Sequence, residues 1–490
     1  MKLLGVGLLS GAIFVAALGG LLASSCKHAD PPVPSVPPAG VETDPASPQR
    51  PGDPAMGYQQ LLNAPYVDCG IPASLIDGRD LSIALPVLGY PPEVVTAPNR
   101  DPKNQALPYF LTRVTDKNGV DLISTNCLSC HANTFQGNLV IGLGNANIDT
   151  TGDIAEFVSF IGSQITSPTD VAAYAPFRDR MTTLSPHVKI DTMGLTAADN
   201  LAIELFGRRD PATLEWKGDY QIQVPSDVFA VPVAAPPWWR MRKQNGMFST
   251  GSFRGDHTRF MFAASSLCID NQSDSMAIDQ YFSNVRAYIA SLTPPKFPKP
   301  INIDLAMAGE RVFIENCSGC HGRYSSLEAG NTDFYPNLIV PVEDVGTDPA
   351  LYHLADEFVD AVEPWIEKTY FGPTNSFVKT KGYLAPPLDG IWITAPYLHN
   401  DSVPNLETLL DSSKRPKYFT RSWISDDFDF DNVGYAYKVE TTGKVDGDAS
   451  LANRQKYDTT RPGYSNEGHL YGDVLTEDER RAVIEYLKTL

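Results

Sequence analysis

Two copies of the pattern C-x-x-C-H constrain this chain more than any other feature. They read CLSCH at Cys127–His131 and CSGCH at Cys317–His321. With 7 cysteines and 8 histidines in 490 residues, roughly 0.002 such matches are expected by chance, so two copies indicate dedicated sites. This spacing is typical of haem c, which is attached through thioether bonds to the two cysteines and takes the following histidine as proximal ligand of its iron.

Paired cysteines also occur in zinc sites and in redox-active dithiols. A zinc site that pooled all four thiols would leave His131 and His321 unexplained. A thioredoxin-like redox pair would need a strand before it and a helix after it. We therefore predict two covalently bound haem c groups. Their attachment and proximal residues are Cys127, Cys130, His131, Cys317, Cys320 and His321.

The N-terminal stretch MKLLGVGLLSGAIFVAALGGLLASSC predicts an export signal at residues 1–25. Small residues before Cys26 are typical of a bacterial lipoprotein, so we expect a lipid anchor at Cys26 and a place in the periplasm or at the cell surface, on the outer membrane. Plain secretion and a retained membrane helix are the alternatives. The proline-rich segment 26–56 predicts an extended tether of about 70 Å.

The formal net charge is −19, and it becomes one unit more negative when the segment that carries Lys2 is removed. Such acidity argues against nucleic acids and anionic membrane surfaces as partners. Two cysteines, Cys69 and Cys268, belong neither to the motifs nor to the anchor. In an oxidising compartment they either form a disulfide or remain two buried thiols.

The helical patterns predict a mainly α fold made of two tandem class I cytochrome c-like domains with long insertions. An amphipathic stretch, DLAMAGERVFIEN, leads into the second motif. Similar closing segments, RAYIASL at 286–292 and IEYLKTL at 484–490, indicate an internal repeat. With a proline-rich linker at 293–300, the predicted domains are 57–298 and 299–490.

The second iron lacks a methionine ligand from its own domain, because no methionine occurs from Gly322 to Leu490. His469, in the glycine-flanked loop SNEGHLYG before the closing helix, is our first candidate for its sixth ligand. His399, in TAPYLHND, is the second candidate, and neither histidine is the third possibility. His353 is the remaining histidine of that domain.

The first domain shows no comparable ligand, although it contains several methionines together with His187 and His257. Its stretch 236–262 mixes aromatic and basic side chains. They line a distal pocket, or they pack the core and neutralise haem propionates. For a reactive site at haem 1, Phe253 would exclude water, and Arg254 or His257 would stabilise negative charge. The arginines of this stretch are Arg240, Arg242, Arg254 and Arg259.

Three passages carry a family resemblance: the two spaced haem motifs, GIWITAPYLHNDSVPNLETLL at 390–410, and the ending SNEGHLYG…LTEDERRAVIEYLKTL. With them the chain resembles the di-haem cytochrome c peroxidase superfamily, and within it the di-haem rubber oxygenase branch. The resemblance covers roughly residues 59–490 and is strongest in the second half. It implies a helical body with one reactive haem and one six-coordinate electron relay.

The resemblance also implies roles for single residues. The first haem would bind oxygen, with Trp238 (or equally Trp239) and Phe253 nearby, and His469 would be the distal ligand of the second. The chain departs from the peroxidases, which carry a tryptophan a few dozen residues after the first motif, because its first tryptophan after His131 is Trp216. It is also shorter than typical rubber oxygenases. Ca²⁺ is often held between the domains of the superfamily, and no pattern here identifies its ligands.

These expectations lead to an exported haem peroxidase or oxygenase. Haem 1 would activate O2 or H2O2, and haem 2 would relay electrons from a donor protein or a small redox molecule. The alternative is a plain electron-transfer cytochrome in which both irons are six-coordinate. The organic substrate cannot be read from the residues.

Overall fold

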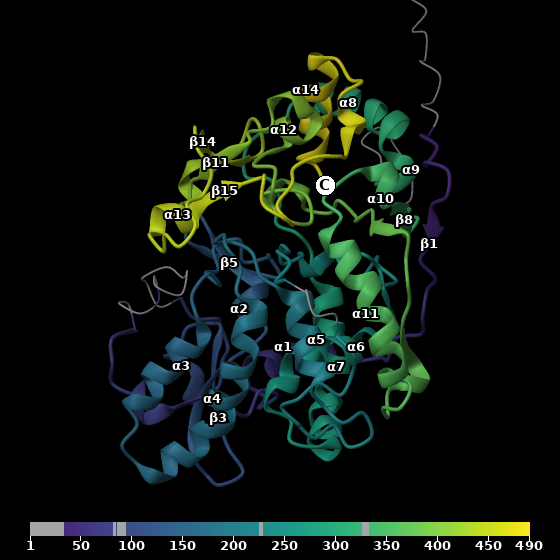
Figure 1. Ribbon diagram of the computed structural model, residues 1–490. Helices are drawn as coiled ribbons and strands as arrows, with labels where there is room; N and C mark the ends of the chain where they lie inside the picture. The colour runs from purple at the N-terminus through teal and green to yellow at the C-terminus, as the bar shows by residue number, and fades with distance from the viewer. Residues whose placement is uncertain (1–33, 82–84, 86–94, 225–228, 326–332) are drawn as a thin grey trace, which may run out of the picture.

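The computed structural model describes residues 34–81, 85, 95–224, 229–325 and 333–490. Elements from the first half of the chain form the lower part of the molecule in Figure 1, and the last two hundred residues form most of the upper part. The α-helices within the described residues are α1 (Pro54–Asn63), α2 (Leu128–His131), α3 (Ile154–Ser163), α4 (Pro168–Val188), α5 (Ala198–Gly207), α6 (His257–Met261), α7 (Gln272–Ser291), α8 (Ile303–Asn316), α9 (Ser318–His321), α10 (Val342–Val345), α11 (Ala350–Ile366), α12 (Leu406–Leu410), α13 (Leu451–Gln455) and α14 (Glu477–Leu487).

Short strands make the fold mixed α/β, so the prediction of a mainly α protein is wrong. Among the described residues the sheets are β1-β8-β10, β14-β11-β15, β2-β4-β3, β12-β13, β5-β6 and β7-β9. Their strands are β1 (Glu42–Thr43), β2 (Ile71–Pro72), β3 (Leu111–Thr115), β4 (Asp121–Thr125), β5 (Ala132–Phe135), β6 (Asn138–Ile141), β7 (Phe253–Gly255), β8 (Leu338–Pro341), β9 (Asn375–Phe377), β10 (Gly382–Leu384), β11 (Tyr418–Arg421), β12 (Phe428–Asp429), β13 (Gly434–Tyr435), β14 (Tyr437–Val439) and β15 (Lys456–Asp458).

The hairpin before the first haem motif explains this error. Strands β3 and β4 pair antiparallel with Arg113 opposite Ile123, and they are rich in β-branched residues, which favour strands. Gly119 closes the turn between them at a φ of 83°, a conformation that glycine adopts at little cost. The first motif therefore follows a strand, whereas the second follows helix α8.

Each half nevertheless has an opening helix that crosses a closing helix at a glycine. In the first half α1 packs on α7, and a Cβ at Gly57 would lie 1.9 Å from the carbonyl oxygen of Asn284. In the second half α8 packs on α14, and a Cβ at Gly309 would lie 1.9 Å from the carbonyl oxygen of Ala482. The backbones approach this closely only because both positions lack a side chain.

Replacing Gly309 with alanine is therefore expected to destabilise the second half by about 2 kcal/mol, the usual cost of forcing an extra carbon into a packed contact. Chemical denaturation followed by helical circular dichroism measures the change. Gly152→Ala is the matched control, because its new Cβ would meet nothing within 4 Å and should change stability by less than about 0.5 kcal/mol. Equal effects of the two substitutions would contradict the close crossing.

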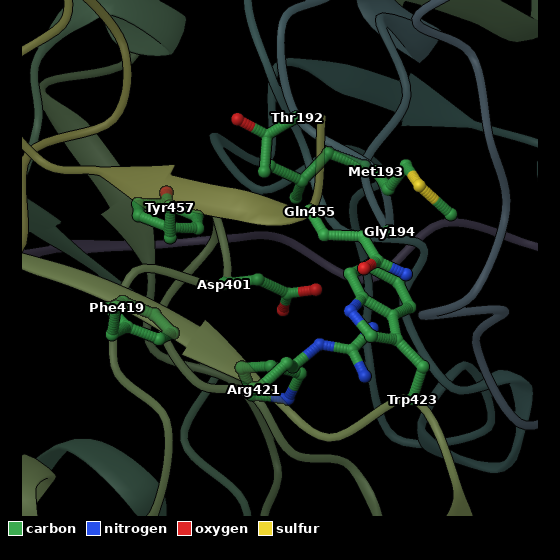
Figure 2. Close-up of a pocket in the computed structure, with 11 residues that line it drawn as sticks. Thr192, Met193, Gly194, Asp401, Phe419, Arg421, Trp423, Gln455 and Tyr457 are labelled. Atoms are coloured by element: carbon green, nitrogen blue, oxygen red, sulfur yellow. The ribbon is translucent and has the colours of Figure 1, made fainter. Parts of the chain in front are cut away.

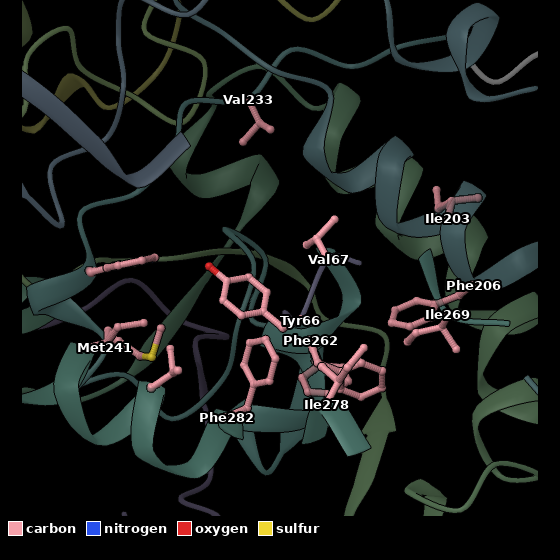
Figure 3. Close-up of a cluster of buried hydrophobic side chains, with 14 of the residues drawn as sticks. Tyr66, Val67, Ile203, Phe206, Val233, Met241, Phe262, Ile269, Ile278 and Phe282 are labelled. Atoms are coloured by element: carbon pink, nitrogen blue, oxygen red, sulfur yellow. The ribbon is translucent and has the colours of Figure 1, made fainter. Parts of the chain in front are cut away.

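The hydrophobic cores do not follow the predicted boundary at 298/299. The larger core, part of which appears in Figure 3, joins side chains around Tyr66 and Phe282 to α11, which comes from the second half of the sequence. The Trp365 indole of α11 donates a hydrogen bond of 2.7 Å to the carbonyl oxygen of Arg209. In the same core Cys69 and Cys268 form a disulfide. The two halves therefore share their interior.

The described part of the predicted tether, residues 34–56, lies against this body. Strand β1 adds to the edge of β8, and the Asp44 side chain beside it is completely buried. Figure 1 shows β1 next to β8 at the side of the molecule. The segment is extended, as its prolines predict, but its polar residues find partners on the body. The export signal and Cys26 lie outside the described residues, and no helix among the described ones is long and apolar enough to cross a membrane.

Candidate haem-binding sites

The first motif forms a single helical turn directly after β4. Cys127 precedes helix α2, and His131 ends it. The His131 Nδ1 lies 3.1 Å from the carbonyl oxygen of Pro236. Because a carbonyl only accepts, Nδ1 must carry the proton and Nε2 is left with its lone pair. This tautomer is the one that a proximal iron ligand requires.

The second motif has the same arrangement, but a helix precedes it instead of a strand. Helix α8 ends at Asn316, and the short helix α9 carries Cys320 and His321. The His321 Nδ1 donates to the carbonyl oxygen of Pro386 over 2.9 Å. The Nδ1 of each proximal histidine is thus held by the carbonyl oxygen of a proline, Pro236 or Pro386, which leaves Nε2 free of that bond.

His469 lies opposite His321. The two ring centroids are 6.1 Å apart, with 53° between the ring planes. Two imidazoles on opposite sides of one iron, each with a metal–nitrogen bond of about 2 Å, have centroids about 6 Å apart. Burial lowers the pKa of His469 to about 3, so the ring is neutral, as an iron ligand must be. The pair therefore fits a bis-histidine haem.

Arg415 holds the loop that carries His469. Its guanidinium donates to the carbonyl oxygens of Asn466 at 2.6 Å, Gly468 at 2.7 Å and His469 at 3.3 Å. It also donates to the carbonyl oxygens of Thr408 and Leu409, both at 3.1 Å. The guanidinium is planar, and its N–H donors point in fixed directions. When carbonyl oxygens accept from all of them, the backbone segments that carry these oxygens are held in one geometry. No sequence pattern marked this residue, because its acceptors are all main-chain atoms.

The motif cysteines are free thiols that the protein largely encloses. All four are partly exposed. Burial raises the pKa of Cys127 to about 11 and that of Cys317 to about 12. Two thiols followed directly by a histidine, at each motif, are the groups that haem c attachment requires.

Trp238 and Trp239 link the two sites. The Trp238 indole stacks on His131, with centroids 4.9 Å apart and 22° between the planes. It therefore lies on the proximal side of the first site. The neighbouring Trp239 is fully buried, and its indole nitrogen donates to the carbonyl oxygen of Asp389 over 2.8 Å. Asp389 comes three residues after Pro386, the acceptor for His321.

Phe253, the second predicted distal residue, is buried in an aromatic cluster. Its ring centroid lies 5.1 Å from the centroids of Phe260 and Phe377. The cluster is part of the larger core, which also contains Leu128 within the first motif and Ala132 directly after it. Phe253 therefore helps to exclude water from the core that contains the first motif.

Arg254 and His257 contact the N-terminal segment. Arg254 forms an ion pair with the buried Asp44. The His257 backbone N–H donates to the Gln49 side chain over 3.0 Å, and its Nε2 lies 2.6 Å from the carbonyl oxygen of Asn245. Burial lowers the pKa of His257, so the ring is a neutral donor to that carbonyl. Both side chains hold this loop in place.

Arg240 differs from the other basic residues of its stretch. Arg242 pairs with Asp389 at 3.1 Å, and Arg259 pairs with Asp279. Arg240 instead donates to the carbonyl oxygen of Asp389 and to the Thr394 hydroxyl. Its charge adds to burial in lowering the pKa of His321. A buried cation beside that histidine suits an anionic haem propionate.

The TAPYLHND loop contacts the first half of the chain. His399 stacks on Tyr383 with centroids 4.4 Å apart, so it does not lie opposite His321 as His469 does. Its carbonyl oxygen accepts from the Ala234 N–H over 2.8 Å. Asp401 faces a small cavity together with Arg421 and Trp423, as Figure 2 shows.

Metal sites other than haem receive no support from the geometry. Within the part of the chain that the structure describes, no group of three or more histidine, cysteine or acidic side chains is arranged to hold a metal ion. A zinc site that pooled the two cysteine pairs would need such a group.

Comparisons with known proteins support a cytochrome c-like relationship. A family model described as "RoxA-like, cytochrome c-like" matches residues 382–420, which include all of the passage 390–410, one of the three on which the resemblance rests. Two proteins of Sinorhizobium fredii are similar over parts of their length. The uncharacterized protein y4iJ is 30% identical over 41% of this chain and 41% of its own length. The uncharacterized protein y4iM is 29% identical over 44% of this chain and 56% of its own length. The chain therefore carries a cytochrome c-like segment similar to that family, which is consistent with haem c and an oxidoreductase.

Proposed function

We propose that this chain is an exported di-haem c-type oxidoreductase. One haem is attached at Cys127, Cys130 and His131, and it activates O2 or peroxide. The other is attached at Cys317, Cys320 and His321, with His469 as its second axial ligand, and it relays electrons. Bound haem c supplies the redox-active iron, and the protein supplies its attachment, axial ligands and enclosure.

The difference between the two proximal histidines carries the proposal. His321 is faced by a second imidazole at the spacing of a closed, six-coordinate iron. Among the described residues no histidine ring stands opposite His131 in this way, and the ring beside it is the stacked indole of Trp238. An iron without a strong sixth ligand can bind a small molecule, whereas a bis-histidine iron only exchanges electrons.

The side chains between the sites support electron exchange. Trp238 stacks on His131, and Trp239 is the next residue in the chain. The Trp239 indole donates to a carbonyl oxygen three residues after the one that orients His321. Phe253 and its aromatic neighbours limit water in the core that includes the first motif. The electron source in this proposal is a donor protein or a small redox molecule, met in the periplasm or at the cell surface, where Cys26 provides a lipid anchor.

Carbon monoxide binding to the reduced protein tests the proposal against a plain electron-transfer cytochrome. One carbon monoxide per chain is expected, because one iron is open and the other is closed by His469. His131→Ala should abolish oxygen or peroxide consumption, because the haem 1 iron loses its proximal ligand, while the low-spin spectrum of the other haem remains. Binding of no carbon monoxide by the native protein would favour the electron carrier, and reaction at the Cys317–His321 haem would reverse the assignment.

A further inference from the structure

Residues 35–53 contact both halves of the molecule in turn. At the start, the Ser35 backbone N–H donates to the carbonyl oxygen of Ile314 over 2.9 Å, and the Ser35 hydroxyl accepts from the Gly319 N–H over 2.7 Å. Gly319 is one of the two residues between the cysteines of the second haem motif. A Cβ at Gly319 would lie 2.5 Å from the Ser35 carbonyl oxygen. The segment therefore begins directly against the haem 2 attachment turn.

The end of the same segment is fixed to the first half. The Gln49 side chain donates to the carbonyl oxygen of Gly255 over 2.9 Å and accepts from the His257 N–H. Arg50 pairs with Asp256 and Asp279, both at 2.6 Å. These partners belong to the loop and helices that follow Phe253. The segment thus ends on the part of the first half that carries the predicted distal residues.

Asp44 lies where the two halves meet. Its backbone N–H donates to the carbonyl oxygen of Asn337 in the second half over 2.7 Å. Its carbonyl oxygen accepts from the Asn245 side chain over 2.7 Å, and its carboxylate pairs with Arg254, both in the first half. Asn245 and Asn337 also bond to each other at 2.8 Å. The completely buried carboxylate is expensive to leave unpaired, so its ion pair fixes Asp44 to the first half, while the Asp44 main chain bonds to the second half.

We propose that residues 35–53 act as a clamp that fixes the two haem-bearing halves relative to each other, with Asp44 as a positioning residue that holds Arg254 and the loop 245–257. The clamp itself follows from contacts within the protein, and its effect on haem 1 rests on the proposed function. Electron transfer between the haems and ligand access at haem 1 then depend on a segment that touches neither iron.

Hydrogen–deuterium exchange of the full haem-loaded protein tests the clamp without reference to activity. Asp44→Asn should raise exchange at least tenfold in residues 245–257 and 337–341, on both sides of the clamp. Glu42→Gln is the matched control, because Glu42 lies two residues away and makes only a partly exposed pair with Lys381 at 3.7 Å. It should leave both regions unchanged. Gln49→Ala provides a second variant if Asp44→Asn does not fold, and it should raise exchange in 245–257.

A second experiment measures electron transfer and ligand binding in the same variants by flash photolysis and stopped-flow reduction. Asp44→Asn should slow electron transfer between the haems and alter carbon monoxide rebinding at haem 1, while the low-spin spectrum of haem 2 stays as in the native protein. Exchange that rises only within residues 35–53 would overturn the clamp. If exchange rises as expected but the native protein binds no carbon monoxide, the clamp stands and the proposed function fails.

Discussion

Substituting Cys317 and Cys320 together with serine is expected to lower the covalently bound haem from two groups to one per chain. Thioether bonds form only at the cysteines, and hydroxyl groups cannot replace them. Acid–acetone extraction followed by intact-protein mass spectrometry measures the effect. The same pair of changes at Cys127 and Cys130 should also leave one haem, and the four changes together should leave none.

The disulfide cysteines provide the matched control for this experiment. Cys69→Ser with Cys268→Ser removes the same number of sulfur atoms from the larger core, and both haems should be retained, although stability should fall by about 2–5 kcal/mol. Loss of all haem from the native protein on extraction would rule out covalent attachment at either motif.

Replacement of His469 by alanine should open the second iron. The substitution removes the imidazole that lies 6.1 Å from the His321 ring, so a low-spin, six-coordinate spectrum should become one that responds to external ligands. The reduced variant should bind two carbon monoxide molecules per chain instead of one. Added imidazole should restore the low-spin spectrum, because it fits the space left by the missing ring.

His399→Ala is the control for the same measurement. This residue stacks on Tyr383 and does not face His321, so its removal should leave the spectrum of the second haem unchanged. If the low-spin signal survives in His469→Ala and disappears in His399→Ala, the axial ligand has been assigned to the wrong histidine.

Residues with local chemical signatures were predictable from the sequence. The spacing of cysteines and histidine was enough to identify the two haem motifs. His469 was proposed because no methionine follows Gly322 and because its loop is flanked by glycines. The structure places the rings of His469 and His321 6.1 Å apart, and the axial role of His469 stays a prediction. Such predictions are possible because a ligand's chemistry restricts which residue types can serve.

Features that depend on long-range packing were not predictable. Arg415 positions the His469 loop by donating to backbone carbonyl oxygens. Every residue has such an oxygen, so the sequence does not reveal these contacts. The mainly α prediction missed the strands before the first haem motif, where the β-branched residues of Asp121–Thr125 pair with a neighbouring strand. Asp44 stands in a proline-rich stretch, and its partner Arg254 lies two hundred residues away.

Because residues 35–53 are docked on the body, they also affect the distance and orientation that a lipid-anchored protein would have relative to the bilayer. If Cys26 carries lipid, eight residues separate it from Ser35, and this length spans at most about 30 Å. The mooring point on the body is the Gly319 turn of the second haem site. The relay haem would then face the membrane and the reactive haem the outer medium. A 100-residue carrier with a radius of gyration of about 13 Å is about 34 Å across, so the gap would exclude protein donors of that size and favour small redox molecules, while substrate would approach from the opposite side.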